Sequence, residues 1–146
     1  MKKLFFIFLA IVLLIGVSVG YYLYNMKAKD FVNSKANIIT SVDAIYDEFN
    51  SDEALAATKF VADDIVIQVK GTLKEVLVAA DSTTTLILVG SSNPEATVSM
   101  ALESKTPELA KTLIVGAEIT VNGQCTGILD DFVTKKVQMI RGGIVK

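Results

Sequence analysis

The residues that could do chemistry in this sequence are few, and the missing types limit its chemistry most. The 146 residues include no histidine and a single cysteine, Cys125. Without histidine there is no serine–histidine or cysteine–histidine nucleophile pair, and there is no histidine to bind a metal. A lone cysteine cannot form an internal disulfide. We therefore expect no enzyme activity, no catalytic residue and no cofactor.

Two acidic pairs, Asp63-Asp64 and Asp130-Asp131, could in principle offer carboxylates to a hard cation. Calcium takes about six to eight oxygen ligands, and neither pair has the spacing of an EF-hand loop or its closing glutamate. Adjacent aspartates between apolar stretches are typical of turns. We expect chain reversals at both pairs and no metal site.

Other acidic residues fit helix surfaces. Asp47 and Glu48 suit the solvated face of a helix, and Asp52 and Glu53 suit the first turn of another, where negative charge is favoured.

The remaining reactive or charged candidates also have a structural explanation. Cys125 shares its predicted strand face with Ile119 and Val121, which predicts a buried small apolar side chain rather than a reactive thiol. The basic cluster is Lys135-Lys136 with Arg141, and strand alternation would place Lys136 on the face opposite the other two. We expect a weak anion site there at best.

The first predicted element is an N-terminal stretch without any charged residue, Leu4 to Tyr24. Lys2 and Lys3 precede it, and Lys27 and Lys29 follow it. At about 1.5 Å of rise per residue, a helix of this length crosses a hydrocarbon core of roughly 30 Å. The sequence predicts a signal-anchor helix over residues 1–25 and export of everything after it.

A cleaved signal peptide is the alternative, because Ser18-Val19-Gly20 offers small residues at a cleavage spacing near Gly20. The apolar run continues beyond Gly20 into a tyrosine cluster, Tyr21 to Tyr24, and lysines follow. Tyrosines followed by lysines are typical of a membrane interface, which favours retention. We therefore predict a single-pass membrane protein with an exported domain, and secretion after cleavage as the alternative.

The segment after the helix has two parts. Residues 26–39 are mixed and polar, which indicates a stalk. Thr40 with Asp43 three residues later resembles a helix start, and Asn50 to Glu53 resembles a second one. Apolar residues at helical spacing between these starts (Val42, Ile45, Tyr46 and Phe49) predict a helical lead-in.

From Asp64 onward the hydrophobic period changes to two, which is typical of strands. Gly71 lies inside the first alternating stretch, where a glycine usually marks a bulge or bend. Thr106-Pro107-Glu108 predicts a short helix between the third and fourth strands. The five predicted strands cover residues 65–74, 85–89, 96–102, 119–126 and 132–141.

Three strands, a short helix and two strands form the pattern of a five-stranded OB-like barrel. We therefore predict a mainly β domain over residues 40–146, preceded by the membrane helix and the stalk. The chain also resembles the exported bacterial tRNA_anti-like family from about Ser41 onward. The resemblance rests on three segments: Ala44–Ala54, Val69–Leu73 and Gly116–Gly127. It implies the OB fold more than any function, and Ala62-Asp63-Asp64 stands where members commonly carry Gly-Lys.

OB barrels usually bind ligands on the face of strands two and three. That face would need a polar ligand held by Thr85, Thr97 and Ser99, although a hydroxyl-rich outer face without a ligand explains the same residues. The two strands contain no aromatic residue for base stacking. The formal charge of −2 includes Lys2 and Lys3, so the remainder carries −4, which makes nucleic acid an unlikely partner.

We therefore expect a non-catalytic binding or scaffolding module of the bacterial envelope with a protein or glycan partner. An exported OB domain that binds nucleic acid or a nucleotide is the alternative. The first function predicts an exposed apolar or strongly acidic patch on the domain. The second predicts a basic stripe with exposed aromatic rings.

Overall fold

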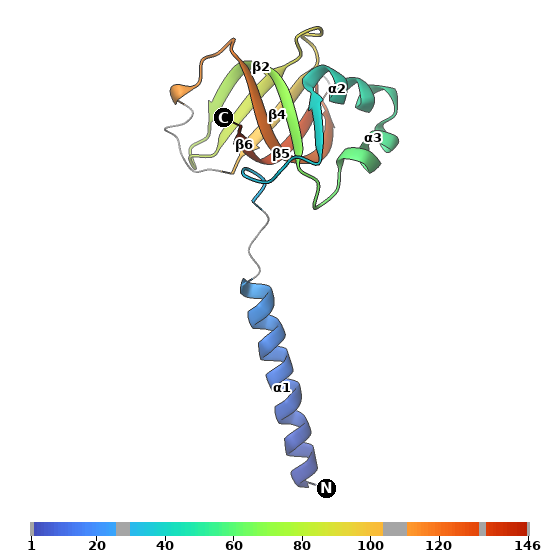
Figure 1. Cartoon of the computed structure of the whole chain (residues 1–146), viewed down its shortest axis with the longest axis vertical. Helices are drawn as coiled ribbons and strands as arrows, with labels where there is room; N and C mark the ends of the chain where they lie inside the picture. The colour runs from blue at the N-terminus through green and yellow to red at the C-terminus, as the bar shows by residue number, and fades with distance from the viewer. Residues whose placement is uncertain (1, 26–29, 104–110, 132–133, 146) are drawn as a thin grey trace.

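The structure is a computed structural model that describes residues 2–25, 30–103, 111–131 and 134–145. Its central feature is a barrel of five strands, shown in Figure 1: β2 (Ile67–Val78), β3 (Thr84–Val89), β4 (Thr97–Leu102), β5 (Glu118–Asp130) and β6 (Lys135–Ile144). Neighbours follow the order β2-β3-β4-β6-β5, and β5 pairs back with β2 to close the barrel. Within the barrel only β4 and β6 pair in parallel. The predicted five-stranded OB-like barrel is confirmed.

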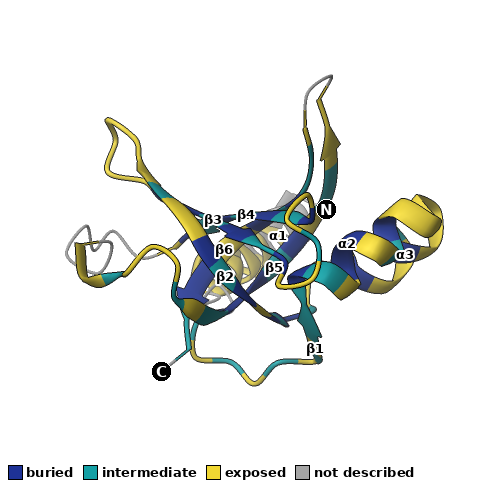
Figure 2. Ribbon diagram, turned by 90° about the horizontal axis from the view of Figure 1, so that it is seen from above, coloured by how far each residue is buried: buried dark blue, intermediate teal, exposed yellow. Residues whose placement is uncertain are grey.

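The barrel interior is formed by alternate residues of each strand, as the period of two predicts. The inward residues of β3 and β4 include Leu86, Leu88, Val98 and Met100, and these four are fully buried. Figure 2 shows the buried positions gathered on the strands and on the adjoining side of the first lead-in helix. The residues between the inward positions face outward and are only partly covered.

The helical lead-in consists of two short helices, α2 (Val42–Ser51) and α3 (Glu53–Phe60). The four apolar residues predicted to share one face of α2 are all buried in the core. Asp52 caps α3 by accepting a hydrogen bond from the Leu55 amide, at 3.0 Å. The cap of α2 is Ser41 rather than Thr40, because the Ser41 hydroxyl accepts the Ala44 amide.

The segment expected to be a stalk packs onto the barrel from residue 30 onward. Phe31 is fully buried, and the Arg141 guanidinium lies 5.5 Å from the centre of its ring. Strand β1 (Ile38–Ser41) then pairs in parallel with the start of β2. The scattered apolar residues of this segment, such as Phe31 and Val32, show neither a helical nor a strand period, so the sequence pattern could not indicate that the segment is packed.

Gly71 is explained by close packing rather than by a bulge. A Cβ atom at this position would lie 2.5 Å from Cγ2 of Val42 and 3.1 Å from the Val89 carbonyl oxygen, so α2 can approach β2 only over a glycine. The bulge lies farther along β2, between Leu73 and Glu75, where the pairing with β3 shifts. Lys74 is the extra residue at that shift.

Helix α1 (Lys2–Asn25) forms where the N-terminal helix is predicted. Among the residues that the structure describes, however, no helix combines the length and apolarity needed to cross a membrane. The structure confirms a helix and gives no support to its membrane-spanning role. The predicted helix start at Thr106 and the predicted strand start at Phe132 lie outside the described residues.

Candidate ligand-binding face

The three predicted ligand-face residues lie together on the outside of β3 and β4. Thr85 pairs with Ala101, and Ser99 and Thr97 pair with Ile87 and Val89 respectively. We call these six outward residues the hydroxyl face. Thr97 and Ser99 are neighbours on one strand, and Thr85 lies diagonally across from Ser99, within the range at which cross-strand side chains interact. Their role in holding a ligand remains a prediction.

The hydroxyl face continues onto the adjoining strands through residues that the sequence did not indicate. Ser99 pairs with Gln138 of β6, and on the other side Ile87 pairs with Glu75 of β2. A row of outward side chains therefore runs across four strands: Glu75, Ile87, Ser99 and Gln138. The OB strand order places the fifth barrel strand beside the third and could have identified Gln138, but the bulge in β2 that aligns Glu75 has no sequence signal.

Apolar side chains are interleaved with these polar groups. Leu77 pairs with Thr85 and is 45% exposed. Ile140, on β6, is 38% exposed. Strands β2 to β6 contain no aromatic residue, so the face has no ring on which a base could stack. Its chemistry is that of a mixed apolar and hydroxyl surface with little charge.

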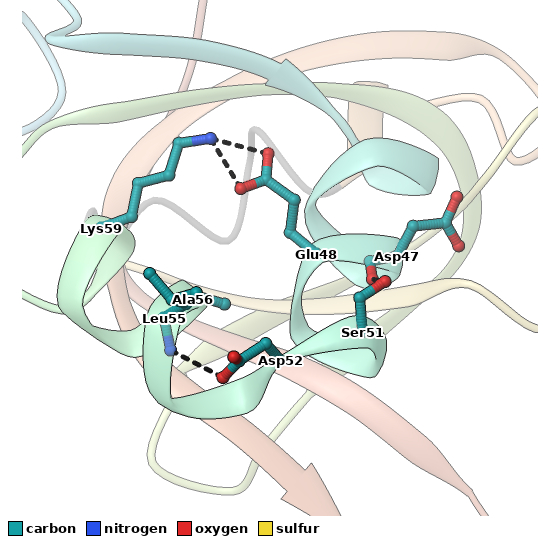
Figure 3. Close-up of a pocket in the computed structure, with 7 residues that line it drawn as sticks. All are labelled: Asp47, Glu48, Ser51, Asp52, Leu55, Ala56 and Lys59. Carbon is teal, nitrogen blue, oxygen red and sulfur yellow. Dashed lines mark hydrogen bonds and ion pairs between the residues drawn. The ribbon is translucent and has the colours of Figure 1, made fainter.

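A hollow lies between α2 and α3 and is shown in Figure 3. Its volume is about 390 Å³. Lys59 forms an ion pair with Glu48 at 2.6 Å, while Asp52 is used as the cap of α3. Glu48 and Asp52 therefore stabilise the two helices, as the sequence predicts for a solvated helix surface and a helix first turn.

The other acidic candidates lie at chain reversals. Asp131 and Thr134 exchange backbone hydrogen bonds of 3.0 and 3.1 Å, which confirms the turn predicted at Asp130-Asp131. Within the described ranges, no group of three or more metal-ligating side chains comes together. That the protein binds no metal remains a prediction.

Cys125 is buried in the barrel opposite Met139, as the alternation predicts. Desolvation raises the pKa of its thiol from 9.0 to about 11, so the thiol is neutral and unreactive at physiological pH.

The basic cluster does not form one site. Lys135 donates a hydrogen bond to the Asn50 side chain at 2.9 Å, whereas Arg141 lies against Phe31.

The chain was compared with known protein sequences, structures and families. No curated protein matches the chain. A solved structure of a Klebsiella pneumoniae protein described as a putative nucleic acid-binding lipoprotein matches with a TM-score of 0.58 and 16% identity, over 74% of this chain and 91% of that one. Entamoeba histolytica asparaginyl-tRNA synthetase matches with a TM-score of 0.39 and 12% identity, over 57% of this chain and 21% of that one. The first likeness supports the OB fold. The family model described as tRNA_anti-like matches residues 1–139, and the chain belongs to that family.

Proposed function

We propose that this protein is an envelope-anchored, non-catalytic OB-fold module that binds a protein partner through the hydroxyl face. The observation that carries the proposal is the composition of that face. Half-buried aliphatic side chains alternate there with hydroxyl and amide groups, next to the exposed Leu77 and Ile140. Protein interfaces combine an apolar centre with hydrogen-bonding groups in this way.

The side-chain chemistry supports the proposed absence of catalytic function. The sequence has no histidine, and the thiol of Cys125 is buried and neutral at physiological pH. A catalytic site would then have to be built without histidine or a reactive thiol, and the carboxylates are its first candidates. Asp43, Glu48 and Asp52, three of the carboxylates on α2 and at its end, are engaged in hydrogen bonds or an ion pair within the domain.

Export and anchoring rest on the N-terminal sequence. Leu4 to Tyr24 carry no charge, and Lys2 and Lys3 precede them. The Klebsiella protein is described as a lipoprotein. This chain has no cysteine near its N-terminal helix to carry a lipid, so the helix itself would act as the anchor.

Nucleic acid is the second candidate, because the Klebsiella protein is described as binding it. The charge of this chain argues against that ligand. The segment after Lys3 carries a formal charge of −4, and the barrel strands have no aromatic side chain. Affinity for nucleic acid rests on neutralising phosphates with lysine and arginine, and on stacked bases worth about 1–3 kcal/mol each.

Site-specific photocrosslinking in cells tests the proposal. A photoreactive amino acid replaces Ser99 in the full-length chain, and the matched control replaces Thr58, an exposed residue of α3. We expect a discrete protein adduct from position 99 and none from position 58. Adducts of equal yield from both positions, or only nucleic acid or glycan adducts from position 99, would contradict a protein-binding face.

A fluorescence-polarisation titration with single-stranded DNA and RNA tests the second candidate directly. Nucleic-acid binding would appear as an affinity that falls steeply between about 50 and 200 mM salt. We expect no saturable binding at either salt concentration.

A further inference from the structure

A polar pocket lies between α2 and the barrel, and none of its lining residues belongs to the hydroxyl face. It is lined by Tyr46, Lys74, Pro94, Glu95, Thr134 and Lys135, which we call the lysine pocket, and its volume is about 380 Å³. The lining comes from α2, from β2, from the loop before β4 and from the start of β6. Pockets of this volume hold small molecules or the end group of a larger ligand.

The two lysines reach this pocket for separate structural reasons. Lys74 is the extra residue of the β2 bulge, and bulges commonly redirect a side chain beside a binding site. Lys135 is held by Asn50 on α2 through its hydrogen bond of 2.9 Å. In the parts of the chain that the structure describes, neither lysine forms an ion pair.

Tyr46 supplies a further polar group. Its side chain is only 7% exposed, yet it makes no hydrogen bond to any residue within the described ranges. The hydroxyl itself is not among the fully buried atoms that lack a partner, so it stays within reach of solvent or of a ligand in the pocket. The pocket that Tyr46 lines offers the space in which a ligand could supply a hydrogen-bond partner.

The loop that forms one wall is fixed in place. The Asp43 carboxylate accepts hydrogen bonds from the backbone amides of Ser91, Ser92 and Asn93, at 2.9, 3.3 and 2.9 Å. These bonds hold the segment that leads to Pro94 and Glu95. The pocket is therefore formed before any ligand arrives, which lowers the entropic cost of binding.

We propose that the lysine pocket binds a carboxylate group. Two ammonium groups with the hydroxyls of Tyr46 and Thr134 form a donor set for an anion. Glu95 lines the same pocket and leaves a net charge of one positive unit among the lining residues. A monoanionic carboxylate neutralises that charge, whereas a phosphate monoester, with nearly two negative charges at neutral pH, would leave one negative charge uncompensated.

NMR titration of the full-length protein in detergent micelles tests this assignment. Acetate and propionate, which are both monoanions, are the carboxylate probes, inorganic phosphate is the competing probe, and sodium chloride holds the ionic strength constant. The readout is the ring resonance of Tyr46, one of four tyrosines, which the Tyr46→Phe variant assigns. We expect a saturable shift with the carboxylates and a weaker response to phosphate.

Variants separate a site from general electrostatics. Replacing Lys74 or Lys135 by methionine should weaken carboxylate binding about tenfold each, because each removes one charge-assisted hydrogen-bond donor. Lys70→Met is the matched control, since Lys70 pairs with Glu118 at 3.0 Å outside the pocket. Unchanged thermal midpoints establish that the variants fold. A shift that does not saturate, that persists in the double lysine variant, or that phosphate produces at lower concentration would overturn the proposal.

Discussion

At the residue scale, Asp43 links α2 to the barrel. Its two carboxylate oxygens accept hydrogen bonds from the backbone amides of three consecutive residues in the loop between β3 and β4. Gly90 precedes that loop, and a Cβ atom there would collide with the Asp43 carboxylate. The side chain and the glycine together join two elements that are nearly fifty residues apart.

We predict that Asp43→Ala lowers the free energy of unfolding by about 1–3 kcal/mol, because it leaves three amides without their acceptor. Urea unfolding of the two proteins measures the difference. Asp47→Ala is the control, since Asp47 is exposed on the same helix and should change stability by less than about 0.5 kcal/mol. Equal losses for the two variants would contradict the role given to Asp43.

Cys125 gives a prediction that depends on pH. Burial raises the pKa of its thiol from 9.0 to about 11, so the unfolded chain ionises at lower pH than the folded one. The folded state binds more protons over that interval, and stability therefore falls as pH rises from 9 towards 11. The free energy of unfolding should fall more steeply in this range for the natural protein than for Cys125→Ala. Parallel pH profiles would show that the thiol does not titrate differently on folding.

These two residues show what a sequence can indicate. The burial of Cys125 followed from its place on the same strand face as Ile119 and Val121, which is a local pattern. The role of Asp43 did not, because its partners lie 48 to 50 residues away and its spacing from Thr40 suggested a capping box instead. The cap is one residue later, at Ser41, which leaves Asp43 available for the loop.

At the element scale, the approach of α2 to β2 depends on a matched pair, Gly71 and Val42. We predict that Gly71→Ala destabilises the fold by about 1–3 kcal/mol through overpacking. Val42→Ala alone should also destabilise it, by leaving a cavity. The double variant should lose less than the sum of the single losses, because the smaller side chain accommodates the new methyl group. Strict additivity in urea unfolding would argue against this contact.

The packed segment before α2 gives a second prediction at this scale. Phe31 is fully buried, so Phe31→Ala should lower the free energy of unfolding by about 3–5 kcal/mol. Ile39→Ala is the control, because Ile39 lies in β1 but is 75% exposed. A stalk that does not pack would give two similar and small losses. The folding unit would then begin near residue 40, as the sequence pattern alone suggests.

Alternation predicted which strand residues face the barrel interior, but it could not predict their neighbours across strands. Those neighbours depend on register, and the register of β2 and β3 changes at the Lys74 bulge. For the same reason the sequence identified Thr85, Thr97 and Ser99 and missed Gln138 and Glu75. The lysine pocket depends on that bulge and on tertiary contacts of α2, so no stretch of sequence contains its pattern.

At the scale of the whole molecule, the charge distribution favours binding of a protein partner over binding of nucleic acid. The barrel and lead-in carry a net negative charge, and Lys70 and Lys59 are each paired with a glutamate. Two of the described lysines are thereby neutralised locally and add little to a basic stripe. A protein partner or a small carboxylate ligand needs complementary groups only where it contacts the surface. A nucleic acid strand needs a continuous positively charged path.

The proposed membrane anchoring rests on the N-terminal helix, and its retention and its cleavage predict proteins of different mass. Retention predicts a protein that contains the Leu4–Tyr24 segment and remains in the membrane fraction after an alkaline wash. Cleavage near Gly20 predicts a soluble protein that begins at Tyr21. We expect retention, because the apolar run passes Gly20 into the tyrosine cluster.

Two variants make that expectation specific. Leu13→Arg places a charge at the middle of the apolar run, at a cost of about 2.5–3.5 kcal/mol for insertion, and should move protein out of the membrane fraction. Replacing Ser18 and Gly20 by leucine removes the small residues that a signal peptidase requires, and for an anchor it should change neither the mass nor the fractionation. If that double substitution instead converts a soluble protein into a membrane-bound one, the helix is a signal peptide and the module acts free in the exported compartment.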